Sequence, residues 1–236
     1  FRRMYLDADC TRRFLVADEV GLGKTLVARG LIAKAVEHLW DTVPRIDVVY
    51  ICSNADIARQ NITRLEIAEE REFNPPSRLT LLPLHLHGLK DGRRLNFVAF
   101  TPGTSFDLKS SGGISSERAL LYQVLRGPWE MGDKRAPCNV MALHRDIDAF
   151  DYDCRQVASQ GLDEGMADAF ITRLKEKDAA DKAEGLATLR ERFEKLCRVF
   201  SRWDSRYDDV DNADRLSLVG ELRQLMAQTA LNWLQP

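Results

Sequence analysis

The chain has 236 residues and a formal net charge of −2, with 44% hydrophobic and 30% charged residues. These values are typical of a globular protein that forms one sizeable core, or one domain with a large insertion. They exclude a uniformly basic surface, so a nucleic-acid partner would have to be bound by a local patch. No apolar run reaches the roughly 18 residues of a membrane span and no signal peptide is evident, so we expect a cytoplasmic protein that makes no membrane contact.

Short apolar runs and helix-forming stretches alternate over the first part of the chain. The predicted strands are 14–17, 48–52, 79–84 and 96–100, and the predicted helices are 26–40 and 55–72. Ser53 and Asn54 follow the second predicted strand and offer N-cap side chains to the next helix. Such alternation indicates a parallel sheet with crossover helices, in which the strand ends share one edge where ligands bind.

The remainder of the chain is predicted to be helical. Apolar residues recur at spacings of three and four in two stretches, 167–174 and 186–200, which is the pattern of one helix face. Asn212 is predicted to cap a last helix. The charge-dense segment 175–184 is predicted to be a solvent-exposed helix surface.

Residues 17–25 read A-D-E-V-G-L-G-K-T and stand between a predicted strand and a predicted helix. Gly21 and Gly23 allow the backbone to turn its N–H groups inward around phosphates. Lys24 would place its ammonium against the β- and γ-phosphates, and the Thr25 hydroxyl would bind Mg²⁺ at a helix N-terminus that itself favours anions. The segment therefore predicts a phosphate-binding loop for a nucleoside triphosphate, and a glycine-rich structural turn is the alternative.

The same string resembles motif I of superfamily-two helicases, especially of the Swi/Snf-like branch, in which an acidic residue stands at the position of Asp18. V-V-Y-I-C-S-N-A-D-I-A-R-Q-N resembles motif Ia, and F-V-A-F-T-P-G-T-S-F resembles a later strand-end motif of bacterial members. The resemblance covers residues 14–106. It implies an α/β fold of the P-loop NTPase, RecA-like type, present in part over 1–126, with a helical insertion or appendage over 127–236.

The resemblance also implies which residues form the site, with Lys24 in the catalytic role and Thr25 as the metal ligand. In the family, two of the strand-end turns touch the sugar-phosphate backbone of the tracked strand, and hydroxyl and amide groups suit such sequence-independent contact. The alternative is that these side chains cap helices or stabilise turns. The implied cofactor-binding residues are Asp18, Glu19, Val20, Gly21, Leu22, Gly23, Lys24 and Thr25, and the implied nucleic-acid contacts are Ser53, Asn54, Thr101, Thr104 and Ser105.

One element that this class of enzyme needs is missing from the sequence. A Mg²⁺-dependent NTPase of this class uses an apolar strand that ends in Asp-Glu, and no such strand follows residue 106. The second lobe, which carries the arginine finger, is missing as well. We therefore expect the chain to be a piece of a larger motor, with the rest of that protein as a partner, and to hydrolyse ATP barely on its own.

Two functions stay open at this point. The first is an ATP-dependent helicase or translocase that uses ATP and Mg²⁺ and acts on nucleic acid, with DNA favoured over RNA. The second is a signalling or remodelling P-loop ATPase that does not depend on nucleic acid, which the long helical segment favours. His85 and His87 lack a third nearby metal ligand, and the five cysteines are widely spaced and are expected to be reduced thiols rather than an iron–sulfur site.

Overall fold

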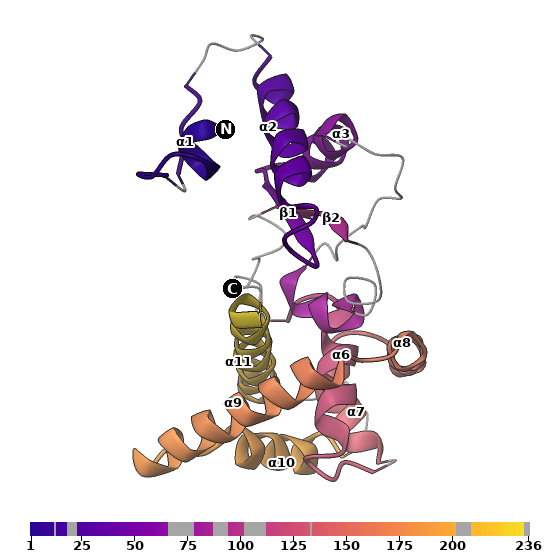
Figure 1. Cartoon of the computed structure of the whole chain (residues 1–236). Helices are drawn as coiled ribbons and strands as arrows, with labels where there is room; N and C mark the ends of the chain where they lie inside the picture. The colour runs from indigo at the N-terminus through magenta and orange to yellow at the C-terminus, as the bar shows by residue number, and fades with distance from the viewer. Residues whose placement is uncertain are drawn as a thin grey trace. The chain divides into compact units, whose positions relative to one another are not determined.

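The computed structural model describes residues 1–11, 13–17, 23–65, 78–86, 94–101, 112–132, 134–201 and 209–233. The chain divides into two compact units. The first, called the sheet unit, comprises residues 1–75 and 88–103, and the second, called the helical unit, comprises residues 76–87 and 104–236. Figure 1 shows the elements of each unit.

The sheet unit contains a small parallel sheet with helices packed against it (Figure 1). Its elements are α1 (Arg2–Tyr5), α2 (Lys24–Leu39), β1 (Ile46–Ile51), α3 (Ala55–Leu65) and β2 (Leu95–Phe100). β1 and β2 pair in parallel, from Ile46 opposite Leu95 to Ile51 opposite Phe100. Parallel pairing requires a crossover connection, and α3 lies within that connection. The α/β class is therefore confirmed, and so are the strands predicted at 48–52 and 96–100 and the helix predicted at 26–40.

The core of the sheet unit lies between this sheet and the two longer helices. Ile46, Leu95 and Phe97 of the strands are buried together with Ile62 and Leu65 of α3. α2 contributes partly buried side chains to this core, and none of its residues is fully buried. The unit is consequently held by a narrow layer of apolar contact.

The strand predicted at 14–17 is wrong. Residues 13–17 have no regular secondary structure, and Phe14 and Leu15 are 62% and 84% exposed. A strand needs a neighbour for its backbone N–H and C=O groups, and the described sheet consists of β1 and β2 alone. The apolar run was too short to decide between a buried strand and an exposed connection.

The strand predicted at 79–84 is also wrong, because Leu79–Leu84 forms a 3₁₀ helix, η1, which belongs to the helical unit. Pro83 lies inside it and cannot donate a ladder hydrogen bond. Every residue from Leu79 to Pro83 is buried, so the segment lacks the alternation of a half-buried strand. η1 packs instead against the last helix of the chain.

The helical unit is built from helices packed around one large apolar core (Figure 1). Its further elements are α6 (Ser115–Arg126), α7 (Arg135–Ala142), α8 (Ile147–Gln160), α9 (Glu164–Ala183), α10 (Leu189–Val199) and α11 (Asp209–Trp233). The helices predicted from the periodicity at 167–174 and 186–200 are confirmed as α9 and α10. α6 lies in this unit by its contacts, whereas the sequence placed the end of the first domain at residue 126.

The structure differs from two local predictions in the helical unit. Asn212 does not cap the last helix, because α11 begins at Asp209 and the Asn212 amide oxygen accepts a hydrogen bond from Arg215 at 2.9 Å. The segment 175–184 does continue α9 with a largely exposed surface, but Asp181 is buried and accepts from the Lys177 ammonium. The charge run therefore includes one anchoring ion pair.

A buried ionic cluster ties η1, α6 and α11 together. The Arg223 guanidinium, which is fully buried, donates to the Glu117 carboxylate at 3.1 Å. The same carboxylate accepts from the Thr80 hydroxyl and from Arg78. Because a carboxylate and a guanidinium are both removed from water here, each depends on the other for its stability in the interior.

Candidate phosphate-binding site

The described end of the predicted phosphate loop is the start of α2. Gly23 precedes the helix with φ of 78°, in the left-handed region that glycine adopts without strain. A Cβ at this position would meet only the Leu26 side chain, at 3.8 Å, so the backbone conformation and not crowding requires glycine. Lys24 and Thr25 are the first two residues of the helix, where anions are favoured. Residues 18–22, which include Asp18, Glu19, Val20, Gly21 and Leu22, lie outside the described residues.

A pocket of about 480 Å³ opens at this helix start. Lys24, Thr25 and Arg29 of α2 line one side of it, and Thr63 and Arg64 of α3 line the other. Among the described residues that line the pocket, three are cations and none is a carboxylate. Cationic groups and a hydroxyl at a helix N-terminus suit a ligand that carries phosphates.

Sequence reasoning missed four residues of this pocket: Leu26, Arg29, Thr63 and Arg64. Arg29 follows Lys24 by five positions and carried no motif signal. Thr63 and Arg64 reach the pocket because α3 packs against α2, which is a long-range contact that the sequence pattern does not encode. The positive charge of Arg29 on the predicted helix was the one sequence feature that pointed to any of these residues, and a single cation is a weak signal.

The described residues of the two predicted nucleic-acid turns lie at one edge of the sheet. Ser53 and Asn54 follow β1 and Thr101 follows β2, and the register pairs the last residues of the two strands, Ile51 and Phe100. The sequence expectation of a shared edge is therefore confirmed for Ser53, Asn54 and Thr101. Thr104 and Ser105 lie outside the described residues.

The side chains at this edge differ in what they offer to a ligand. The Asn54 amide oxygen accepts from the backbone N–H groups of Asp56 and Ile57 at 2.8 and 3.2 Å, so the helix-cap alternative is confirmed for this residue. Thr101 is 8% exposed. Ser53 is an exposed residue.

The pocket and these turns lie at opposite ends of α3. Asn54 caps the start of the helix, whereas Arg64 belongs to its last turn. α3 has 11 residues, so its ends are separated by about 15 Å at a rise of 1.5 Å per residue. The expectation that all three loops share one edge is thus not met in the described residues, because the strand that would have anchored the phosphate loop in the sheet does not form.

The histidine and cysteine side chains do not assemble a metal site in the described part of the chain. His85 is half-buried at the end of η1, and burial lowers its pKa, while His87 lies outside the described residues. Burial raises the pKa of the Cys154 and Cys197 thiols to about 12, so both are protonated at neutral pH and are poor nucleophiles and metal ligands.

Within the described residues, no helix has the length and apolar character needed to cross a bilayer. Comparison of the whole chain with protein-family models, with curated proteins and with solved structures finds no match in any of the three.

Proposed function

We propose that the chain is the ATP-binding portion of an ATP-dependent nucleic-acid helicase or translocase, with DNA as the favoured partner. The observation that carries the proposal is the arrangement at the start of α2: a left-handed Gly23, then Lys24 and Thr25 in the first turn, beside a pocket lined by cations. The sequence A-D-E-V-G-L-G-K-T supplies the order of groups that a phosphate-binding loop of this type uses.

The side chains of the pocket fit the triphosphate of ATP. Lys24 would contact the β- and γ-phosphates, and Arg29 and Arg64 would add charge-assisted hydrogen bonds to phosphate oxygens. Thr25 would supply one oxygen ligand to Mg²⁺, which prefers oxygen and keeps several waters. The described residues that line the pocket include no carboxylate to complete the metal site, so the proposal requires one from elsewhere in the protein.

Ser53, Asn54 and Thr101, with Thr104 and Ser105, form the proposed contact with the nucleic-acid backbone. Ser53, which is exposed, is the strongest of the described candidates, because Asn54 caps α3 and Thr101 is buried. Contacts to phosphate and sugar position a strand without reading its sequence, which is what a translocase needs.

A P-loop ATPase that signals or remodels without nucleic acid is the second candidate. The helical unit favours it, since this unit has an extensive core of its own and would offer a rigid surface to a protein partner. The two candidates differ in one measurable property. A translocase hydrolyses ATP faster when DNA is added, and a switch ATPase does not.

The test of the proposed site compares two lysines of the same helix. Lys24→Ala is expected to weaken binding of a fluorescent ATP analogue by about tenfold or more, since one charge-assisted hydrogen bond accounts for about 1.5–3 kcal/mol. Lys34→Ala is the matched control, because Lys34 pairs with Glu37 on the exposed face of α2 and does not line the pocket. Equal affinity of the two variants for the ATP analogue would contradict the role of Lys24 in the proposed site.

In the complete motor, Lys24→Ala is expected to abolish ATP hydrolysis while leaving the fold intact.

A further inference from the structure

A second pocket, of about 530 Å³, lies within the helical unit between α7, α10 and the segment that joins α6 to α7. It is called the α7–α10 pocket here. Its volume is within the range of small-molecule sites in proteins. It takes no part in the proposed ATP site, because the two pockets share no residue.

Part of the lining of the α7–α10 pocket is apolar and aromatic. Trp129, which is 9% exposed, and Phe193 of α10 both line it, and their ring centroids lie 4.9 Å apart at an interplanar angle of 43°. Met131 and Pro137 add further apolar surface. Aromatic rings attract a further ring at their faces and edges, and a methionine sulfur also favours a ring. A flat aromatic group therefore matches this part of the lining.

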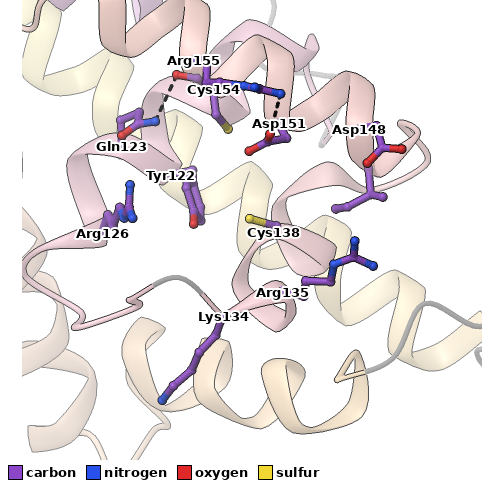
Figure 2. A pocket seen from close by; sticks show the side chains of 11 residues that line it. Tyr122, Gln123, Arg126, Lys134, Arg135, Cys138, Asp148, Asp151, Cys154 and Arg155 are labelled. Carbon is purple, nitrogen blue, oxygen red and sulfur yellow. Dashed lines mark hydrogen bonds and ion pairs between the residues drawn. The ribbon is translucent and has the colours of Figure 1, made fainter.

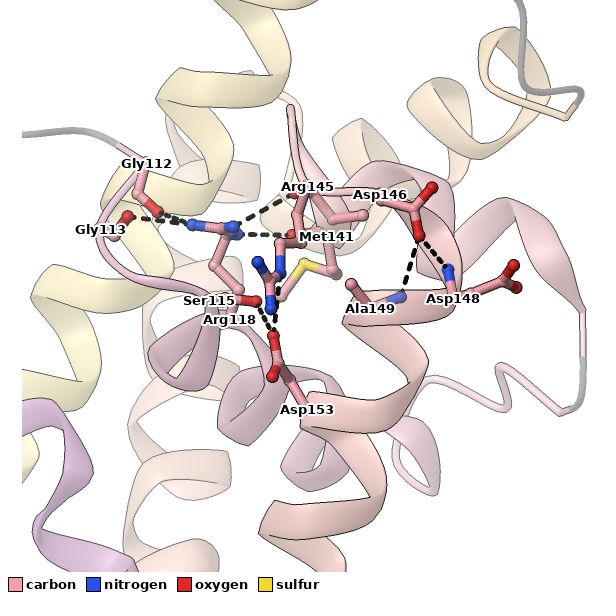
Figure 3. A network of polar contacts seen from close by, with 11 residues as sticks. Gly112, Gly113, Ser115, Arg118, Met141, Arg145, Asp146, Asp148, Ala149 and Asp153 are labelled. Carbon is pink, nitrogen blue, oxygen red and sulfur yellow. Dashed lines mark hydrogen bonds and ion pairs between the residues drawn. The ribbon is translucent and has the colours of Figure 1, made fainter.

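The two helices that form the pocket are fixed by hydrogen bonds from buried groups. The Asn139 amide of α7, a residue that is 2% exposed, donates to the Phe200 carbonyl at the end of α10 at 2.9 Å. α7 is held to α6 in turn by the Arg118 guanidinium (Figure 3). It donates to the carbonyl groups of Met141 and Ala142 at 2.9 and 3.2 Å. The pocket is therefore formed before a ligand arrives, and binding does not have to order it.

The segment between α6 and α7 reaches the pocket through a well-defined turn. The Trp129 N–H donates to the Leu125 carbonyl at 2.9 Å. The Met131 N–H donates to the Arg126 carbonyl at 3.0 Å. Glu130, which stands between them, has φ of 52°, in the left-handed region that residues other than glycine seldom adopt. Backbone of this kind persists where its surroundings require it, and it is frequent at ligand-binding sites.

The charged residues of the lining differ in whether they are already paired. The Arg190 guanidinium bonds to the carboxylates of Glu130 and Glu194, at 3.2 and 3.0 Å. Lys134 and Arg198 also line the pocket, and neither has an ion-pair partner in the part of the chain that the structure describes. These two cations can therefore bind an anion without giving up a protein carboxylate.

Lys134 borders two pockets, and its ammonium lies on the side of α10. Figure 2 shows the neighbouring pocket between α6, α7 and α8, with the Lys134 side chain extending away from Tyr122 and Cys138. Burial raises the pKa of the Cys197 thiol of α10 to about 12, and the Glu194 carboxylate adds to this rise while the Lys134 ammonium opposes it. The Cys197 thiol lines the α7–α10 pocket, so the ammonium acts within that pocket. The thiol stays protonated at pH 7 and adds no negative charge to the lining.

We propose that the α7–α10 pocket binds a small aromatic carboxylate, with its ring against Trp129 and Phe193 and its carboxylate at Lys134 and Arg198. The ring gains aromatic and apolar contact, and the carboxylate receives charge-assisted hydrogen bonds. Such a ligand carries one negative charge at pH 7. The described lining has three cations against two carboxylates, and this excess of one positive charge matches the charge of the ligand.

The probe for the test is phenylacetate, titrated calorimetrically into the full chain. Phenylacetamide keeps the ring and lacks the charge, whereas cyclohexylacetate keeps the charge and lacks the aromatic ring. We expect saturable binding of phenylacetate, and binding at least about threefold weaker for each of the other two compounds. Equal binding of phenylacetamide would contradict the role of the two cations, and equal binding of cyclohexylacetate would contradict the role of the two rings.

Charge-removing variants test the two cations directly. Lys134→Gln with Arg198→Gln is expected to weaken phenylacetate binding by about tenfold or more, because the charge-assisted hydrogen bonds are lost. Lys195→Gln is the matched control, since Lys195 lies on the same helix as Arg198, pairs with Asp214 at 3.9 Å and does not line the pocket. This control is expected to bind phenylacetate like the unchanged chain.

Two further measurements separate a specific site from loss of structure and from binding at the proposed ATP site. Glu194→Gln removes a carboxylate from the lining and is expected to tighten binding by about twofold to fivefold, an increase that partial unfolding would not produce. Saturating Mg²⁺–ATP is expected to leave phenylacetate binding unchanged, whether or not the proposed ATP site is correct. The proposal is overturned if phenylacetate does not bind saturably, if the double variant binds it normally, if Glu194→Gln weakens binding, or if Mg²⁺–ATP displaces the probe.

Discussion

The sheet unit and the helical unit differ in how completely they bury their apolar side chains. In the helical unit, large side chains such as Phe150, Phe170 and Phe200 are fully buried in one continuous core. In the sheet unit, α2 has no fully buried residue, and Val49 and Ile51 of β1 are 51% and 65% exposed. Two strands and two helices provide too little surface to cover both faces of a parallel sheet, which normally is covered on both. Among the described residues, apolar packing therefore stabilises the helical unit more than the sheet unit, whereas the proposed ATP site lies in the sheet unit.

The largest expected effect is on the buried ion pair of the helical unit. Glu117→Ala leaves the Arg223 guanidinium, which is fully buried, without its carboxylate and is expected to lower the free energy of unfolding by about 3–5 kcal/mol. Urea unfolding followed by circular dichroism measures the change. Glu130→Ala breaks the exposed pair with Arg190 and serves as the control, with an expected effect below about 1 kcal/mol. Similar effects for the two variants would show that the Glu117–Arg223 pair is not buried.

Two phenylalanine-to-alanine substitutions, one in each unit, test the contrast in burial between the units. Phe150→Ala is expected to lower the free energy of unfolding by about 3–5 kcal/mol, because its ring is fully buried in the helical core. Phe14→Ala is expected to change it by less than about 0.5 kcal/mol, because that ring is 62% exposed. A large effect at Phe14 would mean that 14–17 is a buried strand after all.

Much of the fold was predictable where the determinants are local. The helices α2, α9 and α10 and the strands β1 and β2 follow from apolar periodicity and β-branched runs within a few residues. The capping of α3 by Asn54 was predictable for the same reason, because the acceptor and its N–H donors are neighbours in the chain.

The features that escaped prediction depend on contacts between distant residues. Glu117 and Arg223 are 106 positions apart, and nothing in the local pattern pairs them. Arg64 joins the ATP pocket through the packing of α3 on α2. η1 is an apolar run that the sequence placed in a sheet, and its burial against α11 decides otherwise.

Alkaline pH is expected to weaken the helical unit through its buried thiols. The pKa of Cys154 is raised by burial to about 12, above its ordinary value near 9, so the protonated thiol is favoured in the folded state. The resulting stabilisation is complete below about pH 9 and is lost as the pH rises toward 12. Urea unfolding across this alkaline range measures the decline. Cys154→Ala is expected to flatten the profile, and an unchanged slope would contradict the assignment to this thiol.

The smallest of these effects concerns the edge of the sheet. Asn54→Ala removes the side-chain oxygen that caps α3 and is expected to lower the free energy of unfolding by about 1 kcal/mol. Ser53→Ala removes an exposed hydroxyl and is expected to have little effect on stability. If the proposed backbone contact is correct, Ser53→Ala weakens DNA binding by the complete motor, whereas a purely structural turn leaves that binding unchanged.

The most direct test of the proposed ATP site is a titration of Mg²⁺–ATP into the ¹⁵N-labelled chain, followed through the backbone amide signals. The proposed function predicts saturable shifts at Gly23, Lys24 and Thr25, with none at Gly185 between α9 and α10. Signals at the start of α2 that stay unmoved at saturating nucleotide would contradict it.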